Sequence, residues 1–391
     1  MKLGMAPENI RQNNQINVIK ILKKKPYTHK QLANKLKLSN TAIQNIVYSL
    51  QTKNLITETK QLINKTGRPS ILVSLNVNNF YTIKITFSKM NEVNVDAHDF
   101  SKKLLLHKQS EYIIHDTNDA NKIIAKLINE IIDAPSLKDK TLCNIVMAVP
   151  GIVNNENLVV TTALNNNSAP YDPYSFLKEN FSCDIIISDD KINYSQGELT
   201  NNKELNQSDI ILFFQMPAPS ISLVINKSIY RGANGFFGEI GFISEHLVTS
   251  QKINFRKQNQ TNIDHALSLI VVMDEINKEL LPSENKIRSI SDLAILLNKK
   301  HPLVTKKISQ HCDRLSSFIL NLSILFDFDT IVFPGEFAPL KEYYFEKLQQ
   351  ALAEYAFSPV KLLLGNNLID SSDNGILDMA IERGLNKILS K

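Results

Sequence analysis

Short apolar runs alternate with longer segments of helical periodicity along most of this chain, from about Phe80 onward. The apolar runs predict strands at 81–87, 94–100, 142–149, 184–188, 210–215, 221–225, 330–333 and 360–364. The periodic segments predict helices at 118–133, 262–280, 305–325, 338–355 and 373–389, with another that begins near Lys191. Strands that alternate with helices are typical of α/β folds. A body of about 310 residues is expected to divide into two lobes with a cleft between them.

The segment before this body differs from it in charge. Residues 1–70 contain thirteen Lys and Arg but two acidic residues, a formal charge of +11, whereas the whole chain carries +5. The remainder is therefore mildly acidic, at −6. A basic module joined to an acidic body indicates that the module binds a polyanion and that the body has another task.

Composition narrows the class of protein further. Hydrophobic residues make up 43% of the chain, which is enough for a large core and too much for a disordered protein. No apolar run reaches the ~18 residues of a membrane span, and the N-terminus lacks the apolar segment of a signal peptide, so we expect a cytoplasmic protein. Cys143, Cys183 and Cys312 are far apart in the sequence, which argues against disulfides and a cysteine-rich zinc site.

Three helices are expected in the basic module. Residues 14–25 place apolar side chains on one stripe, and Pro26 ends that helix. Thr28 begins a capping-box pattern that opens a second, short helix. Ser39 is a good N-cap for a third helix at 40–52. Helix, tight turn and helix in this order are typical of a helix-turn-helix.

The third helix carries an uncharged face that can form hydrogen bonds with DNA. Asn and Gln pair with adenine in the major groove, whereas lysines attract phosphates regardless of sequence. Residues 55–57 and 71–73 then predict two strands whose polar connection would form a wing, with an arginine placed to enter a minor groove. The predicted DNA-contacting residues are Asn40, Thr41, Gln44, Asn45, Tyr48, Lys65 and Arg68. The alternative for the whole module is a three-helix protein-interaction module with a solvated lysine face. For Tyr48 alone, the alternative to a DNA contact is packing against the wing.

Three segments of the body have the form of known motifs. They are Val149-Pro150-Gly151-Ile152-Val153, Ser188-Asp189-Asp190 followed by Gly197-Glu198, and the stretch from Tyr230 to Gly241. These segments resemble the V-P-G-x-V, E-N-D…G-E and Y-R-G-x-x-G-x-x-G-E-I-G-H motifs of the ROK family of repressors, open reading frames and kinases, and the third is the most specific. The resemblance covers nearly the whole chain and is strongest to the transcriptional branch. It implies a winged helix-turn-helix followed by a two-lobed, actin-like ATPase body.

Both phosphate-binding motifs of the family's kinases are lost. Phosphoryl transfer needs backbone N–H groups close to the phosphates, and hence glycines. The family's D-x-G-G-T falls on 84–88, where Lys84 replaces the acidic residue and Phe87 replaces a glycine. The second loop, G-T-G-I-G, falls on 216–220, which contains no glycine and two prolines. We therefore expect no enzymatic activity, no catalytic residue and no cofactor.

The family's zinc motif is missing as well. Its histidine is replaced by Phe242, and residues 252–261, where its cysteines would lie, contain none. His246 and His265 remain, but two isolated histidines do not make a tetrahedral structural site. The sequence therefore predicts no metal.

The resemblance implies a sugar site in which carboxylates and amides meet vicinal hydroxyls. It places Asp190 at the catalytic Asp of the kinases, Asp189 at an Asn, Glu239 and Asp264 at sugar-contacting Glu positions, and Asn165 as a weaker contact. Because three positions depart from the family pattern (Asp189, Phe242, Asp264), the site could bind another sugar, bind weakly or bind none. Asp189 and Asp190 also have a structural interpretation as N-caps of the next helix, and Glu239 one as a loop residue.

The combined interpretation is a transcriptional regulator of carbohydrate genes, a repressor by resemblance, controlled by a small sugar of which xylose is one example. The expected domains are a head at 1–77, a first lobe at 78–197 closed by the helix at 373–391, and a second lobe at 198–372. A homodimer or tetramer would bind a palindromic double-stranded DNA operator. The alternatives are a sugar kinase with a fused head, a DNA-binding protein without an effector, and a protein-binding adaptor.

Overall fold

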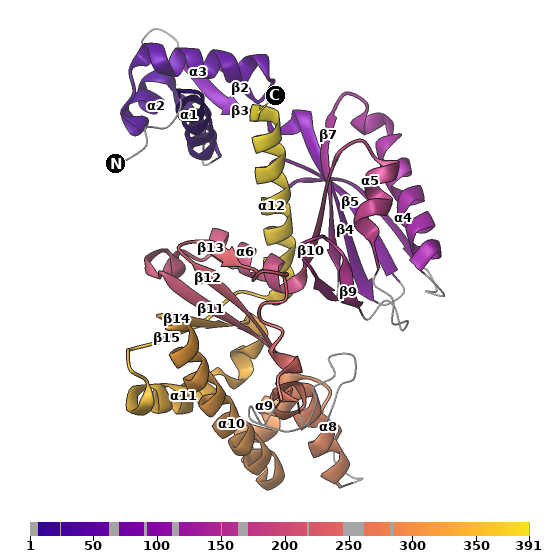
Figure 1. The fold of residues 1–391 in the computed structure, drawn as a ribbon, viewed down its shortest axis with the longest axis vertical. Coiled ribbons are helices and arrows are strands. Elements are labelled where there is room, and N and C mark those ends of the chain that lie inside the picture. Colours follow the sequence, from indigo (N-terminus) through magenta and orange to yellow (C-terminus); the bar gives the residue numbers. More distant parts are fainter. Residues whose placement is uncertain are drawn as a thin grey trace. The chain divides into compact units, whose positions relative to one another are not determined.

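A computed structural model describes residues 7–23, 25–61, 70–89, 92–111, 117–149, 151–162, 171–216, 219–244, 262–281 and 285–390 (Figure 1). The chain divides into two compact units. Unit 1 consists of Met1–Ala148, Pro173–Ile187 and Met379–Lys391, and unit 2 of Val149–Asp172 and Ser188–Asp378. No helix in the described ranges is both long enough and apolar enough to cross a membrane.

The N-terminal part of unit 1 is a winged helix-turn-helix. Its helices are α1 (Pro7–Leu22), α2 (His29–Leu36) and α3 (Asn40–Thr52), and its strands are β1 (Tyr27–Thr28), β2 (Ile56–Gln61) and β3 (Ser70–Leu75). The strands form an antiparallel sheet of order β1-β3-β2. Three predicted helices and two predicted strands are thus confirmed, although α1 begins earlier and ends sooner than its sequence pattern indicated.

Local hydrogen bonds explain where the helices of this module begin. Thr28 Oγ1 accepts from the Gln31 N–H at 3.3 Å while the Gln31 side chain accepts from the Thr28 N–H at 2.9 Å, which completes the predicted capping box. Lys37 ends α2 with a φ of 55°, and Ser39 Oγ accepts from the Ala42 N–H at 3.1 Å to begin α3. The tight turn between α2 and α3 therefore follows from two caps that lie close together.

The rest of unit 1 is a five-stranded sheet of order β10-β7-β4-β5-β6. Its strands are β4 (Phe80–Lys89), β5 (Glu92–Asp99), β6 (Leu104–Glu111), β7 (Thr141–Val149) and β10 (Asp184–Asp189). The β4–β5 and β5–β6 pairs are antiparallel, whereas β4 and β7 are parallel. Helices α4 (Thr117–Ile132) and α5 (Pro173–Asn180), with short 3-10 turns at Val77–Asn79 (η1) and Pro135–Leu137 (η2), complete this part.

Unit 2 contains a second five-stranded sheet, of order β13-β12-β11-β14-β15. Its strands are β11 (Ile210–Gln215), β12 (Ser220–Ile225), β13 (Ser228–Tyr230), β14 (Thr330–Phe333) and β15 (Lys361–Leu364), and β8 (Gly151–Val153) pairs with β9 (Val159–Thr162) as a hairpin. Parallel pairing of β11, β14 and β15 and antiparallel pairing of β11, β12 and β13 give a mixed sheet. Both sheets carry the α/β architecture that the alternating pattern predicts.

Helices fill the remainder of unit 2 and bury a large core against its sheet. They are α6 (Asp190–Asn201), α7 (Ile263–Leu267), α8 (Leu269–Glu279), α9 (Ile290–Asn298), α10 (Pro302–Phe326) and α11 (Lys341–Tyr355), with 3-10 turns at Lys203–Gln207 (η3), Ile240–Phe242 (η4) and Gly335–Leu340 (η5). The predicted helix at 262–280 is wrong in one respect. It is divided at Ser268, whose φ of −72° and ψ of 120° are extended.

The last helix, α12 (Leu368–Ser390), has its final turns in unit 1, where they close the core of the N-terminal module. Ile381, Leu385 and Leu389 belong to the same apolar cluster as Leu32, Ile43 and Leu50 of that module. Lys53, at the end of α3, donates from Nζ to the carbonyls of Ile388 and Leu389 at 3.1 and 2.9 Å. A cation is stabilising there because the C-terminal carbonyls of a helix carry partial negative charge.

Candidate functional site

Helix α3 presents the predicted DNA-contacting residues to solvent. Its inner face buries Ile43, Ile46, Val47 and Leu50 in the core of the module. Ser49 is buried as well, and Ala42 and Gln51 are half-buried. All five residues predicted on this helix are exposed: Asn40, Thr41, Gln44, Asn45 and Tyr48. Tyr48 is 69% exposed, so the alternative in which it packs against the wing finds no support among the described residues. The result is a polar helix face that can approach base edges.

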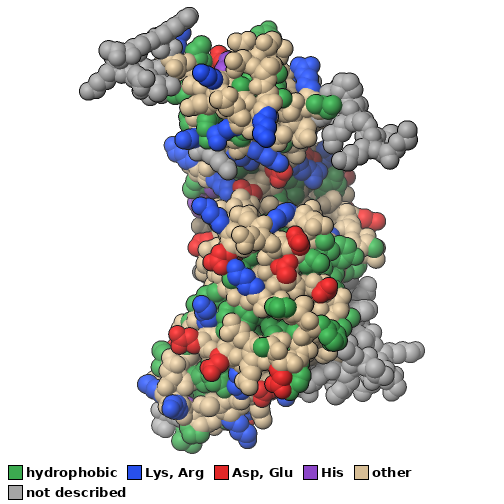
Figure 2. All heavy atoms as spheres, turned by 90° about the vertical axis from the view of Figure 1, so that its left-hand side faces the viewer, with side chains coloured by type: hydrophobic (Ala, Val, Ile, Leu, Met, Phe, Trp, Pro, Cys, Tyr) green, Lys and Arg blue, Asp and Glu red, His purple; other side chains and the backbone are tan. Residues whose placement is uncertain are grey.

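The surroundings of this face are basic. Lys25, Lys30, Lys35, Lys37 and Lys60 are exposed on the module. Figure 2 shows Lys and Arg side chains over this module, at the top of the view, where acidic side chains are sparse. Strands β2 and β3 pair from Ile56↔Leu75 to Gln61↔Ser70, so the two strands that flank the predicted wing are present. Lys65 and Arg68, the predicted wing contacts, lie outside the described residues.

A hollow separates part of α3 from α1. It has a volume of about 630 Å³, and it is lined by Ile10, Arg11, Asn14, Ala42, Asn45, Ile46, Tyr48, Ser49 and Thr52. Asn45 and Tyr48 therefore border this hollow, whereas Asn40, Thr41 and Gln44 do not line it. The three residues on the first turns of α3 are the better placed for base contacts, since N-terminal residues of a recognition helix reach into the groove.

The predicted effector residues of unit 2 begin at the N-terminus of α6. Asp189 is buried and its Oδ1 accepts from the Ile192 N–H at 3.0 Å, so it is the N-cap of α6, as its structural interpretation predicted. Burial raises the pKa of Asp189. Asp190 follows as the first helical residue and reaches the surface. Desolvation, and then the neighbouring carboxylates of Asp189 and Asp373, raise the pKa of Asp190 to about 6.

Glu239 forms an ion pair that no sequence motif indicates. Lys191 Nζ contacts Glu239 Oε1 and also donates to the carbonyl of Phe237 at 3.2 Å. Burial raises the pKa of Glu239, although the Lys191 ammonium opposes that shift. Lys191 follows Asp190 directly, so this pair joins the α6 terminus to the loop at 237–239. A sugar hydroxyl that bonds to Glu239 would have to share it with Lys191.

Asp264 lies beside the same loop. A Cβ added to Gly241 would come within 3.2 Å of Asp264 Cβ, and the Ile263 N–H donates to the Ile243 carbonyl at 2.8 Å. Desolvation raises the pKa of Asp264, opposed by His265. The fold thus links the α6 terminus, which carries Asp189 and Asp190, to Glu239 through Lys191, and it places Asp264 of α7 beside Gly241 of the same loop. Asn165 lies outside the described residues.

Glycines hold the loop at 230–241 in its shape. Gly235 and Gly238 have φ values of 85° and 86°, in the left-handed region, and a Cβ on Gly238 would lie 1.7 Å from the Ile221 carbonyl oxygen. The Asn155 side chain donates to the carbonyls of Gly232 and Ala233 at 3.1 and 2.8 Å. Asn155 lies in the turn of the β8–β9 hairpin, two residues after the V-P-G-x-V segment ends at Val153. The hairpin that begins within one recognised motif therefore contacts the glycine loop of another.

Glu198 is a second residue whose role sequence reasoning did not assign. It is fully buried in α6, and its carboxylate accepts from the Asn366 N–H and Nδ2 at 2.9 Å, from Ser371 Oγ at 2.6 Å and from Asn202 Nδ2 at 3.2 Å. It fixes the start of α12 against α6. The sequence feature that could have indicated this role is the place of Glu198 in the Gly197-Glu198 motif.

The position of the kinases' first phosphate loop is occupied by a buried ion pair in unit 1. Lys84 Nζ lies 3.7 Å from Asp96 Oδ2 on the neighbouring strand β5, and Asp96 Oδ1 lies 2.6 Å from His107 Nδ1. Lys84 and Asp96 are both buried. A lysine held in this way offers neither the acidic side chain nor the glycine backbone of a phosphate loop.

Metal ligands do not gather in the described part of the chain. No group of three or more His, Cys, Asp and Glu side chains there has the geometry to hold a metal ion. Phe242 lies in η4 at the position of the family's histidine. His246 and residues 252–261 are outside the described ranges, so the absence of a zinc site stays a prediction.

Comparison with known proteins connects this geometry to a family. The sequence profile of the ROK family matches residues 99–364. The xylose repressor of Staphylococcus xylosus is 24% identical over 310 residues, which are 77% of this chain and 76% of that protein. The xylose repressor of Bacillus spizizenii is 24% identical over 232 residues, and the match spans 59% of this chain and 60% of that protein.

One solved structure shares the fold over almost the full length. It is a ROK family transcriptional regulator described as a homologue of the E. coli MLC protein, with a TM-score of 0.77 and 17% identity. The match covers 98% of this chain and 100% of that one. A winged helix-turn-helix followed by an actin-like body of the sugar-kinase type is therefore the fold of this chain, as the motifs predict.

Proposed function

The chain belongs to the ROK family, and from that premise we propose that it is a DNA-binding repressor of carbohydrate genes whose affinity for DNA depends on a small sugar. The observation that carries this proposal is the winged module, in which a polar, solvent-exposed α3 face lies among exposed lysines. Such a face supplies base contacts and phosphate contacts together. Two relatives named as xylose repressors support the same function.

We propose that Asn40, Thr41 and Gln44 read base edges, that Asn45 and Tyr48 contact the DNA from the α1 side of the helix, and that Lys65 and Arg68 extend from the wing. The head at 1–77 would act as one domain, and the lobes at 78–197 and 198–372 as its sensor. A homodimer would place two heads on a palindromic operator. Binding to chromosomal DNA implies a cytoplasmic location.

The sugar would bind at Asp190, Glu239 and Asp264, with Asp189 holding the α6 terminus and Asn165 as a further contact. Carboxylates accept hydrogen bonds from vicinal hydroxyls, and their raised pKa values are typical of functional sites. An effector shifts DNA affinity only by its differential affinity for two states, typically ~1–3 kcal/mol. Xylose is the first sugar to test, on the strength of the relatives' names.

We propose that the protein is not an enzyme. The buried Lys84–Asp96 pair, and the sequence at 216–220 with its two prolines, support this. A coupled ATP assay with a panel of sugars tests it. Turnover that is lost in Asp190→Asn would make the kinase alternative correct.

One observation favours a second candidate, a repressor without a sugar effector. Asp189 is already committed to capping α6 and Glu239 to Lys191, so two of the predicted contacts have partners within the protein. Calorimetry with monosaccharides separates the two proposals, because the second predicts no heat from any of them.

The deciding experiment measures binding of the full chain to fragments from upstream of its own gene, with and without xylose, glucose and other monosaccharides. We expect footprint protection over a palindrome, and release by one sugar. Absence of any protected sequence would reject DNA binding and favour the adaptor alternative.

A further inference from the structure

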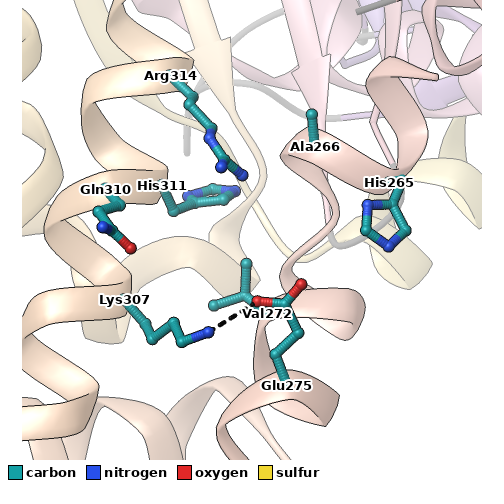
Figure 3. A pocket seen from close by; sticks show the side chains of 8 residues that line it. All are labelled: His265, Ala266, Val272, Glu275, Lys307, Gln310, His311 and Arg314. Carbon is teal, nitrogen blue, oxygen red and sulfur yellow. Dashed lines mark hydrogen bonds and ion pairs between the residues drawn. The ribbon is translucent and has the colours of Figure 1, made fainter. Parts of the chain in front are cut away.

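A polar cavity lies within unit 2, lined by none of the residues proposed for the sugar. It has a volume of about 270 Å³ and is bordered by α7, α8 and α10 (Figure 3). One ordered water needs only ~10–15 Å³, so this cavity has room for a small organic molecule. Ala266 and Val272 are its apolar lining residues, and the others have polar side chains: His265, Glu275, Lys307, Gln310, His311 and Arg314.

Helix α10 supplies one wall of the cavity. Its residues 307, 310, 311 and 314 follow the spacing i, i+3, i+4 and i+7 and therefore share one face of the helix. His311 forms the buried floor. Its Nε2–H donates to the Leu267 carbonyl at 2.9 Å, and its Nδ1 accepts from the Tyr344 hydroxyl at 2.8 Å. Burial lowers the pKa of His311 to about 4, so the ring is neutral and both of its nitrogens are occupied.

The two cations of this wall differ in their partners. Lys307 Nζ lies 3.2 Å from Glu275 and 2.8 Å from Glu279, so its charge is balanced within the protein. Arg314 has no hydrogen bond or ion pair with any described residue, and Figure 3 shows its guanidinium beside the His311 ring at the cavity. The neutral state of His311 allows that approach. The Gln310 amide also has no hydrogen-bond partner in the described ranges.

The part of the cavity near Arg314 suits an anion with several oxygens, because the Glu275 carboxylate lies away from Arg314 and is paired with Lys307 (Figure 3). A guanidinium binds phosphate or carboxylate through two parallel N–H donors. Gln310 adds a donor one helical turn before Arg314, and His265 faces the cavity from α7 on the other side. A tetrahedral phosphate can meet donors from two walls, whereas a planar carboxylate offers two oxygens in one plane. We propose that this cavity binds a small organic phosphate, with Arg314 as its principal contact. The cavity shares no lining residue with the proposed DNA-binding face or the proposed sugar site.

Isothermal calorimetry on the full chain tests this, with glycerol 3-phosphate as the probe and glycerol as its neutral match in a phosphate-free buffer. The basic N-terminal module also attracts anions, so the variants must be matched in charge. Arg314→Gln and Lys306→Gln each remove one positive charge from exposed positions of α10, but Lys306 does not line the cavity. Long-range attraction falls equally in both.

We expect saturable one-to-one binding of glycerol 3-phosphate in the parent and in Lys306→Gln, and none of glycerol. Arg314→Gln should weaken binding about tenfold or more, since a charge-assisted contact contributes ~1.5–3 kcal/mol. Arg314→Lys keeps the positive charge but lacks the two parallel donors of the guanidinium. Its affinity for glycerol 3-phosphate should lie between those of the parent and Arg314→Gln. Gln310→Leu should also weaken binding of glycerol 3-phosphate, because it removes a second donor. Thermal melting verifies that each variant folds.

Three outcomes would overturn the proposal. The first is an absence of saturable binding by the parent protein. The second is equal binding by Arg314→Gln and Lys306→Gln, which would place the anion elsewhere on the surface. The third is stronger binding of succinate than of glycerol 3-phosphate, which would make the ligand a carboxylate.

Discussion

The buried carboxylate of Glu198 stabilises unit 2 through several hydrogen bonds. It satisfies four donors from Asn202, Asn366 and Ser371. Glu198→Ala leaves these donors unpaired, so we expect it to lower the free energy of unfolding by about 3 kcal/mol or more. Guanidinium denaturation measures this. Glu204→Ala removes an exposed carboxylate, 3.3 Å from Lys361, and should change stability by less than ~1 kcal/mol. Equal effects would contradict the assigned role of Glu198.

Asp190 should destabilise the protein at neutral pH. Its pKa is about 6 in the folded protein, above its ordinary value of 3.8, so the folded state binds the proton more tightly than the unfolded chain does. Stability therefore falls as pH rises from about 4 to about 6 and stays lower above that range. Asp190→Asn removes this dependence.

We expect Asp190→Asn to melt at a higher temperature than the parent at pH 7.5, with a smaller difference at pH 4.5. Scanning calorimetry at both pH values provides the measurement. Asp274→Asn, at an exposed position of α8, controls for the loss of one surface carboxylate. If the difference in melting temperature between Asp190→Asn and the parent grows toward pH 4.5, the predicted direction of the pH dependence is wrong.

At the scale of elements, α6 and α12 cross at two glycines. A Cβ on Gly197 would lie 1.9 Å from the Ser371 carbonyl oxygen, and one on Gly375 would lie 1.9 Å from the Asn193 carbonyl oxygen. Gly→Ala within a helix normally stabilises by ~0.5–1 kcal/mol. Gly197→Ala should instead destabilise by about 1–3 kcal/mol because the helices must move apart. Thr200→Ala, exposed on the same helix, should be neutral or slightly stabilising in the same denaturation assay. A stabilising Gly197→Ala would refute the close crossing.

Elements whose ends are set by local chemistry were predictable from the sequence. Thr28 and Ser39 cap the helices that they were expected to cap, and α3 has the predicted bounds. The break at Ser268 was not predictable, because the apolar pattern continues through it and only packing within unit 2 divides the helix. Strand β6 and helices α5 and α9 were also missed.

The candidate site was predictable in its residue types but not in their partners. The motifs indicated Asp189, Asp190, Glu239 and Asp264 one at a time. The pair between Lys191 and Glu239 joins residues 48 positions apart, so no local pattern reveals it. The pair between Lys84 and Asp96 likewise depends on the register of β4 and β5. Contacts that arise from tertiary packing carry no signal in a single sequence.

At the scale of the whole molecule, the charge of the N-terminal module should control the salt dependence of DNA binding. The logarithm of affinity falls with the logarithm of salt by ~0.9 for each phosphate neutralised. Lys30→Ala, at an exposed position of α2, should reduce that slope by about 1 and weaken binding to all sequences alike. Gln44→Ala should relax sequence preference without changing the slope. Fluorescence anisotropy at several salt concentrations measures both.

Lys278→Ala provides the matched control, since it removes an exposed lysine from α8 of unit 2. We expect it to leave the slope and the preferred sequence unchanged. An equal loss of slope in Lys278→Ala and Lys30→Ala would mean that DNA does not bind through the N-terminal module. A preferred sequence that survives Gln44→Ala would mean that α3 faces DNA with other residues.

The contact between Lys53 and the end of α12 joins residues 335 positions apart, and Ile381, Leu385 and Leu389 form part of the same core. A ribosome therefore finishes the first eighty residues long before it makes the end of α12, which completes the apolar core of the N-terminal module. At ~5–20 residues per second the delay is roughly 15–60 s. During that time the nascent module exposes apolar side chains that chaperones can bind. A truncated chain that lacks the end of α12 would keep those side chains exposed.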